Sequence, residues 1–272
     1  MPVISVCSPK GGVGKTTLAA NLAHVFSASG ARVVCIDFDP QNSLRLYFGV
    51  QLSEERGFIN IFTEDPKAGW IDAVINGGKN LFVIPYGKSS EDQRRALASV
   101  LADDKGPTNY LGEWQKGLFC DPSVLLIADF PPGYSPALAA ISTVADISIV
   151  PLMADASSVS LFSVLENNEL IDRPLNERLG YYIVLNHVDN RIRLNREVQD
   201  FAHGNFADRL LGVIHSDTSV IEAAAMQRSI SDFNQNSSAA FDIEVIARKI
   251  AGLLKFDVKS GTMVLNPESQ GA

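Results

Sequence analysis

Cysteine is scarce in this sequence. Among its 272 residues there are three cysteines, Cys7, Cys35 and Cys120, and no two of them form a C-x-x-C pair. Such a sparse and odd set argues against a disulfide framework and against a thiolate metal site. We therefore expect a protein of a reducing compartment.

Long apolar runs are also missing. The mildly apolar stretch 145–165 is interrupted by Asp146, Pro151 and Asp155, so it does not predict a membrane-spanning helix. No basic segment precedes the first apolar run, which stops at Ser8 and is too short for a secretory signal. These absences predict a cytoplasmic protein.

Basic residues are outnumbered by acidic ones. The chain has 23 Lys and Arg against 31 Asp and Glu, a net charge of −8, which does not suit a protein that coats nucleic acid by bulk electrostatics. Its basic cluster is the string R-I-R-L-N-R, with Arg191, Arg193 and Arg196. Apolar residues make up 46% of the chain and charged residues 20%, which is enough apolar material for a buried core.

Short apolar segments alternate with helical patterns along the whole chain. The short segments are nearly continuous Val, Ile and Leu, as is typical of strands buried on both faces of a parallel sheet. The alternation predicts a single doubly wound α/β domain with a mainly parallel sheet flanked by helices. The predicted strands are Val3–Cys7, Arg32–Ile36, Leu81–Ile84, Val124–Ala128, Ile147–Leu152, Tyr181–Leu185 and Leu210–Ile214.

Apolar periodicity predicts buried faces on three of the helices. We assign residues 1–256 to the domain and expect the polar stretch 257–272 to be a mobile tail. The irregular stretches 51–79 and 103–117 are expected to hold short helices at the rim. The predicted faces are Leu18, Leu22, Val25 and Phe26, then Leu194, Val198 and Phe201, and then Ile246, Ile250, Leu253 and Leu254.

A glycine-rich loop follows the first predicted strand and precedes an Ala- and Leu-rich helix, which is the context of a phosphate-binding P-loop. Its glycines allow backbone N–H groups to surround phosphate oxygens; Lys15 would reach the β- and γ-phosphates, and the Thr16 hydroxyl would bind Mg²⁺. The alternative is a simple turn with Lys15 in solvent. A dinucleotide fingerprint is excluded because Thr17 stands where its third glycine belongs. The ligand is thus a nucleoside triphosphate, with predicted contacts from Gly11, Gly12, Val13, Gly14, Lys15, Thr16 and Thr17.

One position of this loop departs from the ordinary pattern. Pro9 occupies the place of the first glycine and Lys10 follows it, and the resulting K-G-G-x-G-K-T string resembles the deviant Walker A ATPases of the ParA/MinD group. The resemblance implies ATP and Mg²⁺ as cofactors, a homodimer that sandwiches ATP, and a Lys10 that reaches phosphate oxygens of the partner subunit. A second cation near the developing charge would act as an arginine finger does. The alternative is a solvated loop lysine.

Two carboxylates follow the second predicted strand, in the string I-D-F-D-P-Q. Ligands of open α/β sheets lie beyond the carboxyl ends of the strands, so we expect Asp37 and Asp39 near the γ-phosphate. By the resemblance, Asp37 lies near Mg²⁺ and Asp39 positions the attacking water. A simple cap at the end of the strand is the alternative.

A lone carboxylate, Asp129, follows the fourth predicted strand in the string L-L-I-A-D-F-P-P-G. This is the Walker B arrangement, in which the carboxylate holds Mg²⁺ directly or through water. Pro131, Pro132 and Gly133 would shape a segment that responds to the γ-phosphate. The predicted metal residues are Thr16, Asp37 and Asp129, and the predicted catalytic residues are Lys10, Lys15 and Asp39.

The resemblance also assigns Asn186, in the string L-N-H-V-D, as the residue that reads adenine. Many members of the group have a proline after the next strand, where this chain has V-I-H-S-D with His215. The far side of the base pocket is therefore left unassigned.

Several branches of the group differ in features that a sequence can show. An electron carrier of the nitrogenase-reductase type would need cysteines within 130–140 to hold a cluster, and that stretch has none. A MinD-type protein would end in a basic amphipathic helix for the membrane surface, whereas 241–256 carries core-type isoleucines. A partition ATPase would bind DNA through a basic face, and the cluster at 191–196 is more typical of a solvated helix start. Partition stays open as the alternative function.

Most of the chain is similar to the ATPases of bacterial cellulose synthesis, the BcsQ family. The similar segments are D-P-Q-N-S-L-R-L-Y-F-G-V (39–50), I-P-Y-G-K-S-S-E-D-Q (84–93) and I-H-S-D (214–217). The similarity implies a cytoplasmic Mg²⁺-dependent ATP hydrolase that acts as a dimerisation switch in cellulose synthesis and secretion. Its expected partners are cytoplasmic accessory subunits of the cellulose synthase complex, which would recruit it to the inner membrane.

Overall fold

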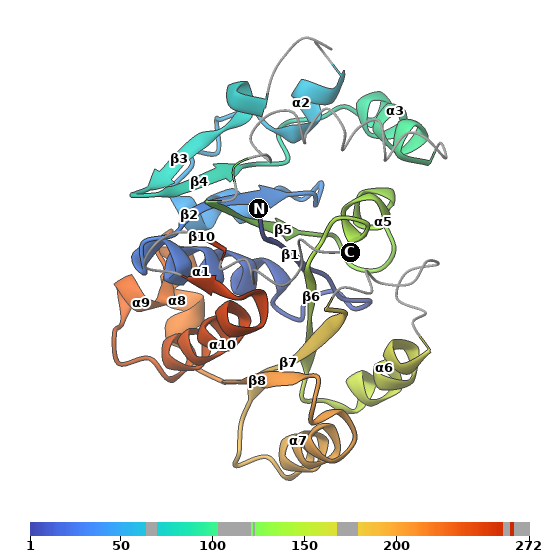
Figure 1. Cartoon of the computed structure of the whole chain (residues 1–272), viewed down its shortest axis with the longest axis vertical. Coiled ribbons are helices and arrows are strands. Elements are labelled where there is room, and N and C mark those ends of the chain that lie inside the picture. Colours follow the sequence, from blue (N-terminus) through green and yellow to red (C-terminus); the bar gives the residue numbers. More distant parts are fainter. Residues whose placement is uncertain (64–69, 103–120, 122, 168–178, 258–261, 264–272) are drawn as a thin grey trace, which may run out of the picture.

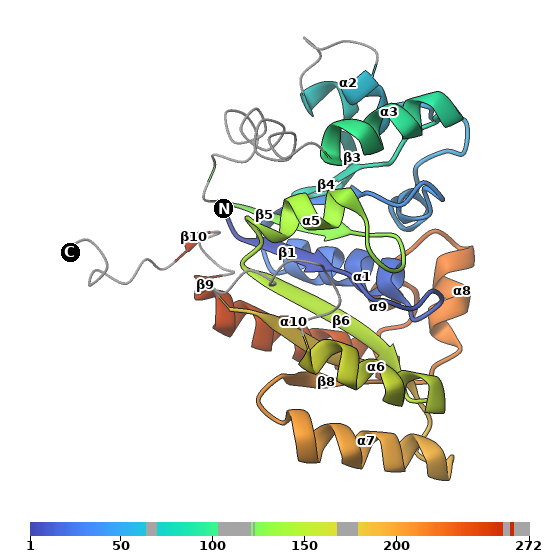
Figure 2. The ribbon, with the colours of Figure 1, turned by 90° about the vertical axis from the view of Figure 1, so that its right-hand side faces the viewer.

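An eight-stranded sheet forms the centre of the computed structural model, which describes residues 1–63, 70–102, 121, 123–167, 179–257 and 262–263. The strand order is β3-β4-β2-β5-β1-β6-β7-β8, and helices cover both faces of the sheet (Figures 1 and 2). All pairs in this sheet are parallel except β3 with β4, so the predicted doubly wound fold is confirmed. The strands are β1 (Val3–Val6), β2 (Arg32–Asp37), β3 (Ile75–Gly78), β4 (Leu81–Ile84), β5 (Val124–Asp129), β6 (Ile147–Met153), β7 (Tyr181–Val188) and β8 (Leu210–His215).

The core lies in two layers, one on each face of the sheet. Alternate residues of a strand point to opposite faces, so Leu125 and Ile127 of β5 belong to the core layer that contains α1 and α10, whereas Leu126 and Ala128 belong to the layer that contains α5 and α6. The helices are α1 (Lys15–Ala28), α2 (Phe58–Thr63), α3 (Glu91–Ala102), α5 (Pro136–Ser142), α6 (Ala156–Glu166), α7 (Arg193–Phe206), α8 (Ser219–Ala225), α9 (Ile230–Phe233) and α10 (Ser238–Leu254), with 3₁₀ turns η1 (Leu44–Phe48) and η2 (Trp70–Ala73).

The predicted helix faces are confirmed on α1 and α10 and only partly on α7. Leu18, Leu22 and Phe26 are buried on α1, and Ile246, Ile250 and Leu254 are buried on α10. On α7 the buried stripe is Val198, Ala202 and Phe206, whereas Leu194 and Phe201 are 41% and 42% exposed. The stripe repeats every fourth residue, and the small Ala202 at its centre contributes little to an apolar pattern. Two of the three residues predicted for the buried face of α7 are therefore partly exposed to solvent.

Two strand pairings were not predicted. The edge strand β3 lies in the stretch expected to be irregular, because its sequence I-N-G-G has two glycines and no alternating pattern. The second pairing joins β9 (Phe256–Asp257) to β10 (Thr262–Met263) in antiparallel fashion. The short helices expected within 51–79 are confirmed by α2 and η2. Cys120, the stretch 103–117 and most of the predicted tail lie outside the described residues.

No helix in the described part of the chain is long and apolar enough to cross a membrane.

Candidate nucleotide-binding site

Most of the predicted site residues lie at the carboxyl ends of three neighbouring strands, β1, β5 and β2, whereas Asn186 lies on β7, two strands away from β1. β5 lies between β1 and β2, and Asp129 at its end is in register with Val6 on one side and Asp37 on the other. The P-loop leaves β1 at this edge and enters α1. The strand order thus brings the glycine loop and the two strand-end carboxylates together.

The P-loop has the backbone that a phosphate cradle requires. Gly12 and Gly14 have φ of 73° and 89°, a left-handed conformation that favours glycine. A Cβ at Gly14 would lie 2.3 Å from the Asn186 Nδ2 atom, so a side chain there would displace the Asn186 amide. Helix α1 begins at Lys15 without a side-chain cap, which leaves the N–H groups of its first turn available to an anion.

Lys15 is a buried cation in this loop. Its side chain is 6% exposed, and its Nζ donates to the Lys10 carbonyl oxygen over a long 3.4 Å. Burial lowers the pKa of Lys15, and the charges of Asp129 and Asp39 oppose that shift. The alternative of a solvated lysine does not agree with this burial.

Asp129 is a buried carboxylate near the Thr16 hydroxyl and the Lys15 ammonium. It is fully buried, and neither of its carboxylate oxygens has a hydrogen-bond partner among the described residues. Burial raises the pKa of Asp129 to about 7, against the opposing effects of the Thr16 hydroxyl and the Lys15 ammonium. An orphaned buried carboxylate is costly unless a cation satisfies it. Asp129 with Thr16 therefore fits a hard, oxygen-binding ion such as Mg²⁺.

Asp37 differs from Asp129 because both of its oxygens are occupied. Oδ1 accepts the Asp39 N–H at 2.8 Å and Oδ2 accepts the Leu44 N–H at 3.1 Å. Burial and the neighbouring Asp129 raise the pKa of Asp37 well above its usual value. Asp37 thus braces the segment that carries Asp39, as the capping alternative expected, and its place near Mg²⁺ stays a prediction.

Lys10 is held within its own subunit. Its Nζ donates to the Asp155 Oδ2 atom at 2.7 Å and also contacts the Ser157 hydroxyl. Asp155 is the N-cap of α6, where its Oδ1 accepts the Ser158 N–H at 2.8 Å. The string D-A-S-S before an apolar helix is an N-cap signature, but no sequence signal connects it to Lys10.

Both polar atoms of the Asn186 side-chain amide form hydrogen bonds. Nδ2 donates to the Val13 carbonyl at 2.8 Å, and Oδ1 accepts the His187 N–H at 2.8 Å. Asn186 also lines a cavity of about 140 Å³ next to the P-loop, with Met153 and Ile214 among the apolar residues around it. The amide therefore ties β7 to the P-loop beside a space suited to a base, and its adenine-reading role stays a prediction.

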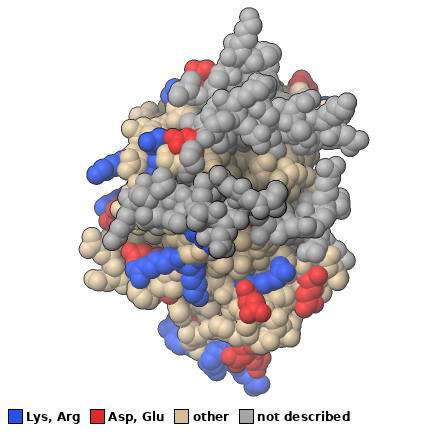
Figure 3. Space-filling view, viewed as in Figure 1, with Lys and Arg blue, Asp and Glu red and all other residues tan. Residues whose placement is uncertain are grey.

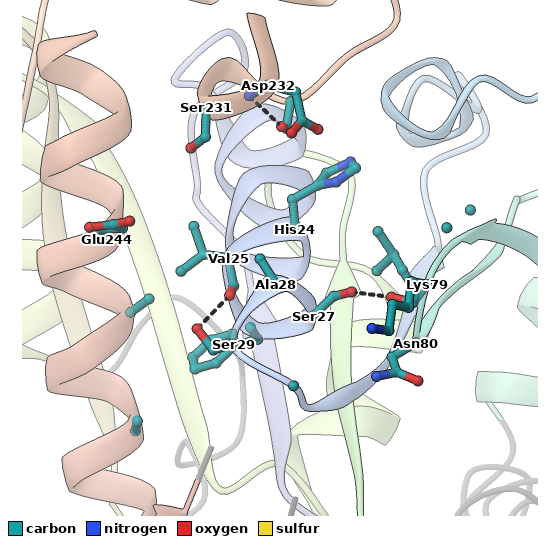
Figure 4. Close-up of a pocket in the computed structure, with 18 of the residues that line it drawn as sticks. His24, Val25, Ser27, Ala28, Ser29, Lys79, Asn80, Ser231, Asp232 and Glu244 are labelled. Carbon is teal, nitrogen blue, oxygen red and sulfur yellow. Dashed lines mark hydrogen bonds between the residues drawn. The ribbon is translucent and has the colours of Figure 1, made fainter. Parts of the chain in front are cut away.

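A larger hollow of about 750 Å³ lies along the C-terminal half of α1. Figure 4 shows His24 and Ala28 of α1 along it, with Glu244 of α10 on one side and Lys79 and Asn80 from the β3–β4 turn on the other. It contains none of the predicted site residues.

A P-loop with a second lysine, placed beside strand-end carboxylates in a doubly wound sheet, defines a P-loop ATPase of the ParA/MinD type. The chain matches the family model "Cellulose biosynthesis protein BcsQ" over residues 1–250 and belongs to that family.

Individual relatives support the broader class. The chromosome-partitioning ATPase Soj of Thermus thermophilus is 26% identical over 250 residues, which cover 91% of this chain and 94% of Soj. The cellulose biosynthesis protein BcsQ of Salmonella typhimurium is 23% identical over 261 residues, 91% of this chain and 93% of that protein. The septum-site protein MinD of Pyrococcus horikoshii, solved with Mg-ADP, has the same fold, with a TM-score of 0.69, 19% identity and coverage of 93% and 96%. Partition and cellulose relatives are thus about equally similar.

Proposed function

We propose that this protein is an Mg²⁺-dependent ATPase that dimerises around ATP and assists bacterial cellulose synthesis and secretion from the cytoplasm, with residues 1–256 as the ATPase domain. The observation that carries the ATPase part is the buried Asp129 carboxylate near the buried Lys15, with no hydrogen bond to it from the residues that the structure describes. Membership of the BcsQ family supports the cellulose part.

Each site residue has a chemical task in this proposal. The N–H groups of the P-loop and the Lys15 ammonium bind the β- and γ-phosphates, while Thr16 and Asp129 would hold Mg²⁺, whose charge offsets that of the phosphates. Asp39 orients the attacking water and accepts its proton. Its segment is fixed by the bond from the Asp39 N–H to Asp37.

Lys10 makes the switch depend on a second subunit. In the single chain it is paired with Asp155, so it must leave that carboxylate to reach phosphates across a dimer. Asp155 accepts bonds from Ser157 and Ser158 as well, and these remain when Lys10 leaves. The exchange of one ion pair for another is therefore a two-state element that ATP and the partner subunit can shift.

The Asp39→Ala variant is expected to bind ATP with nearly parental affinity, to hydrolyse it at least about 100-fold more slowly and to accumulate as a dimer. The phosphate cradle stays complete, whereas the group that orients and deprotonates water is lost. Phosphate release and light scattering with ATP measure the two effects. Asp200→Ala, on an exposed part of α7, should behave as the parent. A monomeric Asp39→Ala protein, or one that hydrolyses at the parental rate, would contradict this role.

Partition is the second candidate, because Soj is as similar to this chain as BcsQ is. The basic cluster gives it little support. Arg191 is paired with Asp189 at 2.7 Å, Arg193 is paired with Glu197 at 2.7 Å, and Arg196 donates to the Asn190 carbonyl. In Figure 3, blue and red atoms accordingly lie side by side at the end of the molecule where Figure 1 places α7. Two of the three arginines are thus already paired with carboxylates inside the protein.

We expect negligible binding of random duplex DNA at physiological salt, copurification with cytoplasmic accessory subunits of cellulose synthase, and a lower cellulose output when the gene is deleted. A salt titration of DNA affinity with ATP present separates the two functions, since phosphate contacts weaken steeply as salt rises. Micromolar, salt-sensitive DNA binding that is lost in Arg193→Glu, together with unchanged cellulose in the deletion strain, would favour partition instead.

A further inference from the structure

Tyr47 lies outside the P-loop and contacts it. Its hydroxyl oxygen is 2.9 Å from the Thr17 hydroxyl oxygen, 30 positions away in the sequence. The phenol packs against the core layer that contains α1, and burial raises its pKa. Asp129 is close enough to Tyr47 to contribute to the same rise. The tyrosine hydroxyl is therefore part of the nucleotide edge of the sheet.

The backbone of η1 holds this hydroxyl in place. At the start of η1 the Leu44 N–H donates to Asp37, and near its end the His24 Nε2 atom lies 3.0 Å from the Tyr47 carbonyl oxygen. The His24 ring also stacks on Phe48 at 5.2 Å between centroids. Because β2 and α1 both anchor η1, the backbone that carries Tyr47 is fixed beside α1 and Thr17.

Which hydroxyl donates in the Thr17–Tyr47 hydrogen bond depends on what else the two hydroxyl groups bind. Each hydroxyl has one proton to donate and can accept on its oxygen. Asn21 donates to the Thr17 backbone carbonyl oxygen at 2.8 Å and not to the Thr17 hydroxyl. If the Thr17 hydroxyl donates its hydrogen bond to a phosphate oxygen, it can only accept in the Thr17–Tyr47 bond. Tyr47 must then be the donor, to Thr17 Oγ1.

We propose that Tyr47 is a positioning residue for the nucleotide: its hydroxyl donates to Thr17 Oγ1 and thereby directs the Thr17 proton toward the phosphates. The inference rests on the proposed function. Two hydrogen bonds in series also polarise and strengthen one another. The Thr17–Tyr47 bond lies within the P-loop region and does not involve Lys10 or Asp39. It should therefore strengthen the binding of ADP and of ATP to the same extent.

The test is a double-mutant cycle on nucleotide affinity, measured by calorimetry with Mg-ADP and with a non-hydrolysable Mg-ATP analogue. Tyr47→Phe is expected to weaken both nucleotides about 5-fold, the effect of one neutral hydrogen bond. Thr17→Val should weaken both further, and the double variant should be no weaker than Thr17→Val alone. Thr17→Ser keeps the hydroxyl and should keep the effect of Tyr47→Phe.

Tyr181→Phe is the matched control. Tyr181 lies at the amino end of β7, with Arg209 4.3 Å over its ring, away from the P-loop edge. Its loss of a hydroxyl should leave both affinities unchanged.

Two results would overturn the positioning role while leaving the proposed function intact. One is a double variant whose loss of nucleotide affinity equals the sum of the losses in the two single variants. The other is a folded Tyr47→Phe protein with a lower melting temperature and parental affinities, which would make the hydroxyl merely structural. If the parental protein binds neither nucleotide, the proposed function fails and the inference fails with it.

Discussion

The Lys15→Ala variant is expected to remain folded and to lose about 100-fold or more in affinity for Mg-ATP. The ammonium is buried and aimed into the P-loop, so it meets the phosphates without having to shed much water. Charge-assisted hydrogen bonds to phosphate are among the strongest that a protein makes, and the loss of a bidentate or multiple contact reaches this magnitude. Calorimetric titration with Mg-ATP measures the loss.

The fold should tolerate this change because other residues, Leu18, Leu22 and Phe26, anchor α1 in the core. Among the described residues, the Lys15 ammonium donates one long hydrogen bond, the 3.4 Å contact with the Lys10 carbonyl. Lys249→Ala is a suitable control, since its ammonium also donates to a backbone carbonyl, that of Leu211, in a different part of the molecule. Unchanged ATP affinity in a folded Lys15→Ala protein would rule out the assignment of this loop.

The fold was largely predictable because buried strands have short, continuous apolar sequences. V-L-L-I-A-D predicted β5 and its terminal carboxylate within one residue. The order of the strands in the sheet could not be predicted from such local patterns. The insertion of β5 between β1 and β2, which puts Asp129 beside Asp37, depends on packing between segments that are far apart in the sequence.

The glycine loop and the strand-end carboxylates were predicted from local strings, since their chemistry is set by neighbouring residues. The partners of these residues were not predicted. Asp155 lies 145 positions from Lys10, and Tyr47 lies 30 positions from Thr17. Each contact forms only when segments that are far apart in the sequence meet at the carboxyl ends of the strands. Likewise, a string such as L-N-H cannot show that the Asn186 amide is already bonded to the P-loop.

The Asp129→Asn variant is expected to be more stable than the parent in the absence of nucleotide and to lose its Mg²⁺-dependent ATP hydrolysis. At pH 8 the parent holds a charged carboxylate that is fully buried and accepts no hydrogen bond from the described residues. Because burial outweighs the favourable effect of Lys15, neutralising this carboxylate should raise the free energy of unfolding by about 2 kcal/mol. For a domain of this size that corresponds to a melting temperature roughly 4–8 °C higher. Thermal unfolding without nucleotide measures this gain, and phosphate release measures the loss of activity.

The pH dependence of this difference has a definite sign. The pKa of Asp129 is about 7 in the folded protein against a usual value of 3.8, so the folded state binds this proton more tightly than the unfolded state does. The destabilisation by the carboxylate therefore develops as pH rises from 3.8 to 7 and is complete above 7. The gap between the variant and the parent should be widest at pH 8 and narrower at pH 5.

Asp217→Asn is the matched substitution of a partnered carboxylate, and it should change stability in the opposite direction. Asp217 accepts the Ser237 hydroxyl at 2.7 Å and the Ser219 N–H at 2.8 Å, and the bonds from these serines lower its pKa. The substitution replaces one acceptor oxygen by a donor group, so the free energy of unfolding should fall by about 1 kcal/mol. Since both variants convert a carboxylate to an amide, the opposite signs isolate the effect of the missing partner at Asp129. Equal destabilisation of both at pH 8 would mean that Asp129 is satisfied inside the protein, and the assignment of Asp129 to a cation would then lose its physical basis.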